Sequence, residues 1–136
     1  MVGALKPVLK GVYVCDDVVG NPVGGKPMIV NLWNAIRVPR GESIPYTLKK
    51  LCVFAWLRGG RGRVTFRVEV VSSETGFRIG QARFFGYEFT NPNATLYGRF
   101  MLEDVTFPAP GIYTVEFFCD GEFLDDQPIQ VLPSEG

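Results

Sequence analysis

The chain has 136 residues, of which 46% are hydrophobic and 21% are charged, a composition typical of a globular protein rather than a disordered one. This length suits one domain over residues 1–136, with a core that needs no disulfide or metal. Fourteen basic and 14 acidic side chains cancel, which argues against nonspecific nucleic-acid binding because that binding depends on neutralising phosphates.

The two halves of the chain carry opposite charges. Residues 1–67 contain 11 basic and 3 acidic side chains, a net charge of +8, whereas residues 68–136 contain 3 and 11, a net charge of −8. If folding leaves the halves apart, a basic edge of one copy can meet an acidic edge of another. We therefore expect a protein partner, and a second copy of this chain is one candidate.

The hydrophobic residues recur with a period of two, which is typical of β-strands. In residues 63–71, for example, every second residue is apolar and predicts one buried face, formed by Val64, Phe66, Val68 and Val70. Runs of this kind, separated by turn-forming residues, predict about eight strands, over 8–16, 27–38, 48–58, 63–71, 77–84, 94–107, 112–119 and 122–132. The run 48–58 is apolar on both faces and should be central. The sequence thus predicts an all-β fold, a two-sheet immunoglobulin-like β-sandwich of mostly antiparallel strands.

Several short segments carry a resemblance to other proteins. They are residues 12–16 (Val-Tyr-Val-Cys-Asp), Gly25-Lys26, residues 107–113 (Phe-Pro-Ala-Pro-Gly-Ile-Tyr), 120–122 and 128–131. Together they resemble a family of small bacterial proteins that is catalogued only as a domain of unknown function, and the resemblance spans nearly the whole chain. It implies a compact β-sandwich in a bacterial, cytoplasmic setting, and it implies no activity.

The cysteines indicate a reducing compartment. Cys15, Cys52 and Cys119 are odd in number and irregularly spaced, which is a poor disulfide framework. Each lies in an apolar, strand-like run, where a free cysteine behaves as a small hydrophobic residue. The first ten residues, broken by two lysines and a proline, match neither a signal peptide nor a membrane-spanning helix. We therefore expect a cytoplasmic protein with free, buried thiols and no membrane partner.

An enzyme active site has little support in this sequence. The chain has no histidine, which removes the commonest general base and the commonest metal ligand. It also has no Cys-x-x-Cys motif, phosphate-binding loop or dinucleotide fingerprint. Paired acids at 16–17, 103–104 and 125–126 lack the spacing of a calcium loop. We expect no catalysis, no cofactor and no metal, with a small carboxylate-dependent enzyme as one alternative.

The first candidate for partner binding is a basic turn. Arg58, Arg61 and Arg63 surround a glycine-rich segment between two predicted strands, which is typical of a hairpin. Guanidinium groups at this turn suit a phosphate or an acidic protein partner. The alternative is a solvated hairpin tip whose charges discourage edge-to-edge aggregation.

The second candidate is an aromatic segment that contains Phe84, Phe85, Tyr87 and Phe89. Adjacent residues of a strand point to opposite faces, so Phe84 and Phe85 cannot both face the core unless a bulge intervenes. The segment therefore belongs either to the core or to a protein interface.

These observations predict a non-catalytic protein-interaction or assembly module that acts through a sheet edge or an exposed aromatic patch. The main alternative is a carbohydrate- or anion-binding β-sandwich module, which an aromatic-lined cleft in a monomer would favour.

Overall fold

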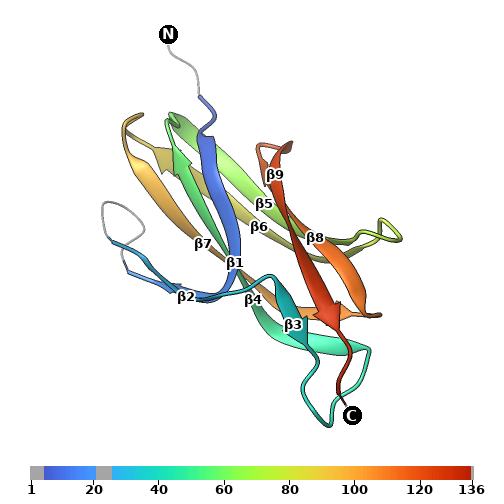
Figure 1. Ribbon diagram of the computed structural model, residues 1–136. Helices are drawn as coiled ribbons and strands as arrows, with labels where there is room; N and C mark the ends of the chain where they lie inside the picture. The colour runs from blue at the N-terminus through green and yellow to red at the C-terminus, as the bar shows by residue number, and fades with distance from the viewer. Residues whose placement is uncertain (1–4, 21–25, 136) are drawn as a thin grey trace.

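The chain is described by a computed structural model that covers residues 5–20 and 26–135 (Figure 1). These residues form nine strands: β1 (Val8–Val19), β2 (Met28–Leu32), β3 (Ala35–Arg37), β4 (Tyr46–Arg58), β5 (Gly62–Ser72), β6 (Arg78–Phe89), β7 (Thr95–Phe107), β8 (Gly111–Cys119) and β9 (Glu122–Leu132). Within the same residues there is no helix that could span a membrane.

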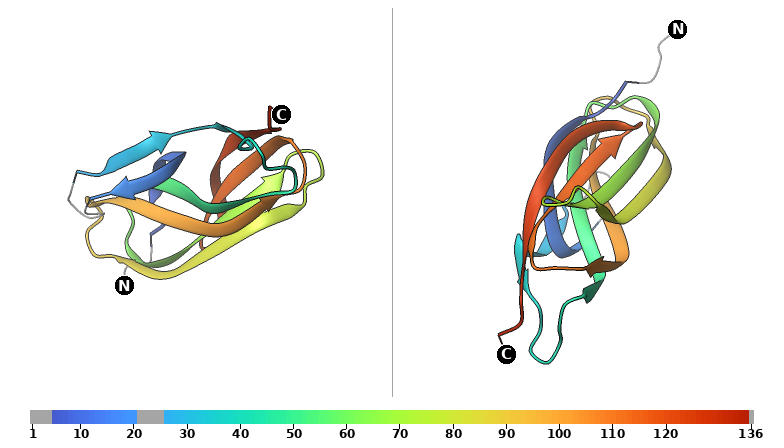
Figure 2. Two further views of the ribbon diagram at one scale, coloured as in Figure 1. Left: turned by 90° about the horizontal axis from the view of Figure 1, so that it is seen from below. Right: turned by 90° about the vertical axis from the view of Figure 1, so that its right-hand side faces the viewer.

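The strands form two sheets that curve around a shared interior (Figure 2). One sheet has four strands in the order β2-β1-β4-β7, and the other has five in the order β3-β9-β8-β5-β6. Neighbouring strands are antiparallel except β3 and β9, which are parallel. The predicted all-β, two-sheet fold is confirmed, with nine strands in the described residues instead of about eight, and the run 48–58 lies in the centre of its sheet as β4.

The inner faces of the two sheets follow the alternation seen in the sequence. On β5, Val64, Phe66, Val68 and Val70 are at most 3% exposed, so the predicted buried face is confirmed. The prediction of free, buried cysteines is also confirmed for Cys15, Cys52 and Cys119.

An aromatic cluster joins the sheets. Phe100, on β7 of the four-stranded sheet, contacts three rings of the five-stranded sheet at centroid distances between 4.8 and 5.4 Å, namely Phe66, Phe84 and Phe117. All three contacts are edge-to-face, an arrangement that brings the positive edge of one ring to the negative face of another. One buried side chain therefore links β7 to β5, β6 and β8.

The predicted single strand over 27–38 is wrong. The structure divides this run into β2, which pairs with β1, and β3, which pairs with β9 in the other sheet. Trp33 N donates to the carbonyl of Val14 (3.0 Å), whereas the carbonyl of Asn34 accepts from Gln130 N (2.9 Å). The chain therefore crosses from one sheet to the other between two neighbouring residues. Two other strands are longer than predicted, because β1 continues to residue 19 and β6 to residue 89. The glycine- and proline-containing segment 20–25, whose composition predicts a turn between the first two strands, lies mostly outside the described residues.

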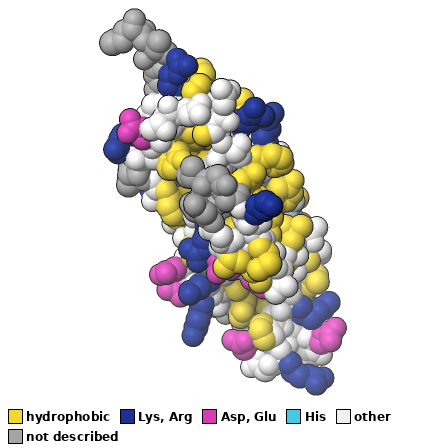
Figure 3. All heavy atoms as spheres, turned by 90° about the vertical axis from the view of Figure 1, so that its left-hand side faces the viewer, with side chains coloured by type: hydrophobic (Ala, Val, Ile, Leu, Met, Phe, Trp, Pro, Cys, Tyr) yellow, Lys and Arg dark blue, Asp and Glu magenta, His cyan; other side chains and the backbone are white. Residues whose placement is uncertain are grey.

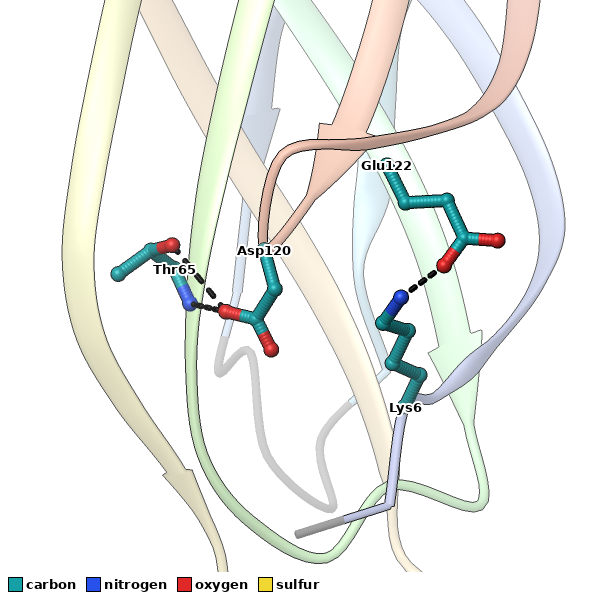
Figure 4. Close-up of polar contacts among 4 residues, drawn as sticks. All are labelled: Lys6, Thr65, Asp120 and Glu122. Carbon is teal, nitrogen blue, oxygen red and sulfur yellow. Dashed lines mark hydrogen bonds and ion pairs between the residues drawn. The ribbon is translucent and has the colours of Figure 1, made fainter.

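The basic and acidic halves of the chain are interleaved. Lys6 pairs with Glu122, as Figure 4 shows, and Asp17 pairs with Arg99. Each pair joins one residue of the first half to one of the second. Each sheet also contains strands from both halves, and a head-to-tail contact between copies stays a prediction.

Truncation of the buried aromatic cluster should be costly. We expect Phe117→Ala to lower the free energy of unfolding by about 3–5 kcal/mol, because it removes a fully buried ring and leaves a cavity. Phe123→Ala is the control, since Phe123 is 48% exposed, and should cost about 1 kcal/mol or less. Urea unfolding of the three proteins measures both effects, and equal losses in the two variants would contradict this account of the core.

Candidate functional site

The basic turn and the aromatic segment, found separately in the sequence, lie together at one end of the molecule. The β4–β5 turn packs against the end of β6, because a Cβ added at Gly60 would lie 2.7 Å from the ring of Phe89. Gly59 of the same turn faces the carbonyl of Pro92, in the turn that follows β6. We name this region the basic–aromatic corner and define it by Arg58, Arg61, Arg63, Phe84, Tyr87 and Phe89.

The arginines form the outer part of the basic–aromatic corner. Arg58 and Arg63 are exposed at the ends of β4 and β5. Arg61 is half-buried, and its main chain exchanges two hydrogen bonds with that of Leu5, of 2.8 and 2.9 Å. Among the described residues none of the three arginines forms an ion pair with a carboxylate. Their charges are therefore available to a partner.

The aromatic residues divide between core and surface. Phe89 is 4% exposed, so its side chain belongs to the core and supports Tyr87, whose ring lies edge-to-face on it at 4.8 Å. Phe84 and Tyr87 are half-buried. The side chain of Phe85 lies outside the described part of the structure. The core alternative therefore holds for Phe89, while Phe84 and Tyr87 present part of their surface.

A bulge shapes this part of β6. The β5–β6 register shifts between Val64, which pairs with Tyr87, and Phe66, which pairs with Phe84. Gly86 has a positive φ of 74°, and the Arg63 guanidinium lies where a Cβ of residue 86 would be. A glycine is therefore needed here both for the backbone and for the arginine that packs on it.

An open groove runs between β6 and β7, the edge strands of the two sheets. Its volume is about 380 Å³, within the range of small-ligand sites, and its lining is Phe66, Phe84, Gly86, Tyr87, Leu96, Gly98, Arg99 and Phe100. We name it the edge groove. The lack of a side chain at Gly86 lets the Arg63 guanidinium lie against the backbone, and the lack of one at Gly98 does the same for the Phe100 ring.

The chemistry of the edge groove is that of binding. Three phenylalanine rings and a leucine offer apolar surface, and the hydroxyl of Tyr87 offers a hydrogen bond. The lining residues include no carboxylate and no thiol. Sequence patterns identified Phe84 and Tyr87, but they gave no signal for Leu96, Gly98 and Phe100, which reach the groove from another sheet.

A second groove, of about 340 Å³, lies near the opposite edges of the sheets. It is lined by Tyr13, Val14, Leu32, Trp33, Asn34 and Gln127, from β1, β2, β9 and the segment that crosses between the sheets. Two aromatic rings and two amide side chains thus face one hollow, which we name the amide groove. None of its residues was a candidate in the sequence.

An ion pair fixes the β1–β2 hairpin over the four-stranded sheet. β1 leaves β4 after Cys15, and Asp17 then accepts a hydrogen bond of 2.6 Å from Nε of Arg99 on β7. Because β4 separates β1 from β7 in the sheet, this contact passes over the outer face of β4. Beneath it lie two buried residues of β4, Cys52 and Phe54. Figure 3 shows this side of the molecule, with hydrophobic side chains bordered by basic ones.

We expect the ion pair to make stability depend on pH. The hydrogen bond from Arg99, followed by that from the backbone N–H of Val18, lowers the pKa of Asp17 below its usual 3.8. A lowered pKa in the folded state stabilises the fold above pH 3.8, and this contribution is lost as the pH falls through the folded-state pKa. Asp17→Asn should therefore destabilise the protein at neutral pH and have little effect in strong acid.

Urea unfolding of Asp17→Asn, Arg99→Gln and the double variant tests this expectation. In the Arg99→Gln background, Asp17→Asn should cost less than it does in the wild type, because the partner is already gone. Equal costs in both backgrounds would show that the two side chains do not interact.

Comparisons with other proteins place the chain in a family but not in a pathway. No curated protein matches it. A solved structure of Pseudomonas fluorescens alkylpurine DNA glycosylase AlkC, bound to DNA containing an abasic site analog, is similar over 89% of this chain and 30% of the glycosylase chain, with 13% identity and a TM-score of 0.47. This chain thus spans less than a third of that enzyme. The model of a family of unknown function matches residues 10–132, nearly the whole sequence, so the chain belongs to that family, DUF6941.

Proposed function

We propose that this chain is a non-catalytic protein-interaction module that binds an extended segment of a partner at the edge groove. One observation carries the proposal: an aromatic-floored groove of about 380 Å³ opens beside two edge strands. An edge strand has N–H and C=O groups on its outer side that an added strand can pair with. In that mode of binding, main-chain hydrogen bonds supply affinity and side-chain pockets supply specificity.

The chemistry of the groove indicates the partner. An apolar side chain fits between Phe84, Tyr87 and Leu96, which line the groove. The arginines of the basic–aromatic corner favour acidic residues next to that side chain. The partner we propose is an extended protein segment with apolar and acidic residues, from another protein or from a second copy of this chain. The setting we propose is a bacterial cytoplasm, where the free thiols stay reduced.

Selection from a random linear peptide library tests the proposal. Bound peptides should shift the amide signals of β6 and β7 in NMR spectra, and added salt should weaken them because screening reduces the arginine contribution. Tyr87→Lys should raise the dissociation constant by at least about tenfold, since it removes apolar contact and adds charge.

The matched control is Phe123→Lys, which changes an exposed aromatic residue on β9, away from the edge groove, and should leave binding unchanged. Selected peptides that shift other strands only, or that bind Tyr87→Lys as well as wild type, would overturn the proposal. Light scattering of the protein alone distinguishes a second copy from a different partner.

We also infer an immunoglobulin-like topology. In support, β1, β4 and β7 follow the order of strands A, B and E of that fold, and β9, β8, β5 and β6 follow the order of G, F, C and C′, with β2 as an addition. A second feature supports the inference. The hydroxyl of Tyr113, near the start of β8, donates to the carbonyl of Ala109 at 2.6 Å, as in the tyrosine corner of immunoglobulin-like domains.

A second candidate function is carbohydrate binding at the amide groove. The ring faces of Tyr13 and Trp33 suit the C–H face of a sugar, and the amides of Asn34 and Gln127 suit its hydroxyl groups. This combination is found in the amide groove and is absent from the lining of the edge groove.

Calorimetry with a panel of oligosaccharides tests this second candidate. Trp33→Ala and Asn34→Ala should each weaken sugar binding by at least about tenfold, because one removes the stacking surface and the other a hydrogen-bonding group. Trp56→Ala serves as the control, since Trp56 is 40% exposed on the outer face of the sheet and does not line the groove. If no oligosaccharide binds, or if Trp56→Ala is as harmful, this function is excluded.

A further inference from the structure

Three sulfur-containing side chains form a row across the four-stranded sheet. Cys15 on β1 lies directly opposite Cys52 on β4, and Cys52 lies directly opposite Met101 on β7. Residues that are directly opposite in an antiparallel pair place their side chains on the same face, close enough to touch. The three side chains therefore share the outer face of the sheet, while their neighbours Val14 and Val53 face the main core.

This row is enclosed by apolar groups. Cys15 and Cys52 are 0% exposed, and Val18 and Phe54 complete the buried cluster in which Met101 also packs. The β1–β2 hairpin, fixed by the Asp17–Arg99 ion pair, lies over them. The sulfur of Cys15 lies 3.9 Å from the carbonyl oxygen of Cys52. Two thiols are thus held side by side away from water, next to the half-buried thioether of Met101.

We propose that Cys15, Cys52 and Met101 form a binding site for Cu(I). Thiolate and thioether sulfurs are soft ligands, and soft ligands select Cu(I) over harder cations. Zn²⁺ fits less well because structural zinc sites use four ligands, and the described residues contain no group of three His, Cys, Asp or Glu side chains that could hold a metal ion. Cu(I) needs only two or three sulfur ligands, and this row offers two buried thiols and one half-buried thioether.

Metal binding must release protons, because the thiols of the structure are free. Two thiols and one Cu(I) ion give a dithiolate complex with one negative charge and two free protons.

This site is independent of the proposed function. It lies on the outer face of the four-stranded sheet, whereas the edge groove lies between the two sheets. Loss of copper binding would leave the peptide-binding proposal unaffected, and failure to bind peptides would leave the copper site unaffected.

The test is an anaerobic titration of the reduced protein with Cu(I), in competition with bicinchoninate, a chromophoric Cu(I) chelator. We expect one Cu(I) per chain, a sulfur-to-copper charge-transfer band in the near ultraviolet, and only sulfur atoms around copper in X-ray absorption spectra. Cys15→Ser and Cys52→Ser should each weaken binding by more than about 100-fold, beyond the usual effect of losing a group that merely supports a ligand.

Two further variants sharpen the test. Met101→Leu conserves volume and apolarity, so it should fold normally, weaken Cu(I) binding by about tenfold and reduce the number of sulfur neighbours. Cys119→Ser is the matched control, because Cys119 is also free and fully buried but belongs to the main core, and it should bind Cu(I) like the wild type. Circular dichroism of each variant verifies folding. If a serine variant does not fold, the Met101→Leu result decides the test in its place.

Several outcomes would overturn the proposal. One is the absence of Cu(I) binding by the wild type, and another is undiminished binding by a folded Cys52→Ser variant. A third is a Met101→Leu variant with unchanged Cu(I) affinity and an unchanged number of sulfur neighbours around copper. The last is a folded Cys119→Ser variant that loses as much Cu(I) affinity as the other cysteine variants.

Discussion

The contacts of Phe100 with three rings of the opposite sheet set the geometry on which the rest of the structure depends. Packed sheets lie about 10 Å apart, and edge-to-face phenylalanine rings fill that space. The ring of Phe100 also lies over Gly98, on its own strand, and forms part of the floor of the edge groove. The same side chain therefore joins the sheets and shapes the surface that we propose for partner binding. A larger residue at position 98 would displace the ring and disturb both.

Most strands could be predicted because apolar and polar residues alternate wherever one face of a sheet is buried and the other is exposed to solvent. β4 shows no alternation, and the structure explains why: its outward residues Cys52 and Phe54 lie under the β1–β2 hairpin and are as apolar as the inward ones. The prediction of one strand over residues 27–38 was wrong for a related reason. This run is apolar at consecutive positions, so its sequence does not indicate where the chain passes from one sheet to the other. Exposure of β2 and β3 depends on their neighbours, which the local sequence does not specify.

The candidate sites were harder to predict, because they depend on register and on contacts between distant segments. The basic turn and the aromatic segment could each be identified from composition, but only the pairing of β5 with β6 shows that they are adjacent. The row of Cys15, Cys52 and Met101 depends even more strongly on strand register. A shift of one residue in the β1–β4 register would place Cys52 opposite an inward-facing neighbour of Cys15 and separate the two thiols. Register of this kind is a property of the whole sheet.

The ends of the described chain lie at opposite ends of the molecule (Figure 1). A pulling force applied between them would act along β1 and β9, since these strands run lengthwise between the two ends. The hydrogen bonds that join β1 to β4 and β9 to β8 lie across that direction, so the force would load them together in shear. Peeling a strand breaks such bonds one at a time, whereas shearing requires many to break at once. The topology therefore gives this small protein mechanical resistance along its long axis.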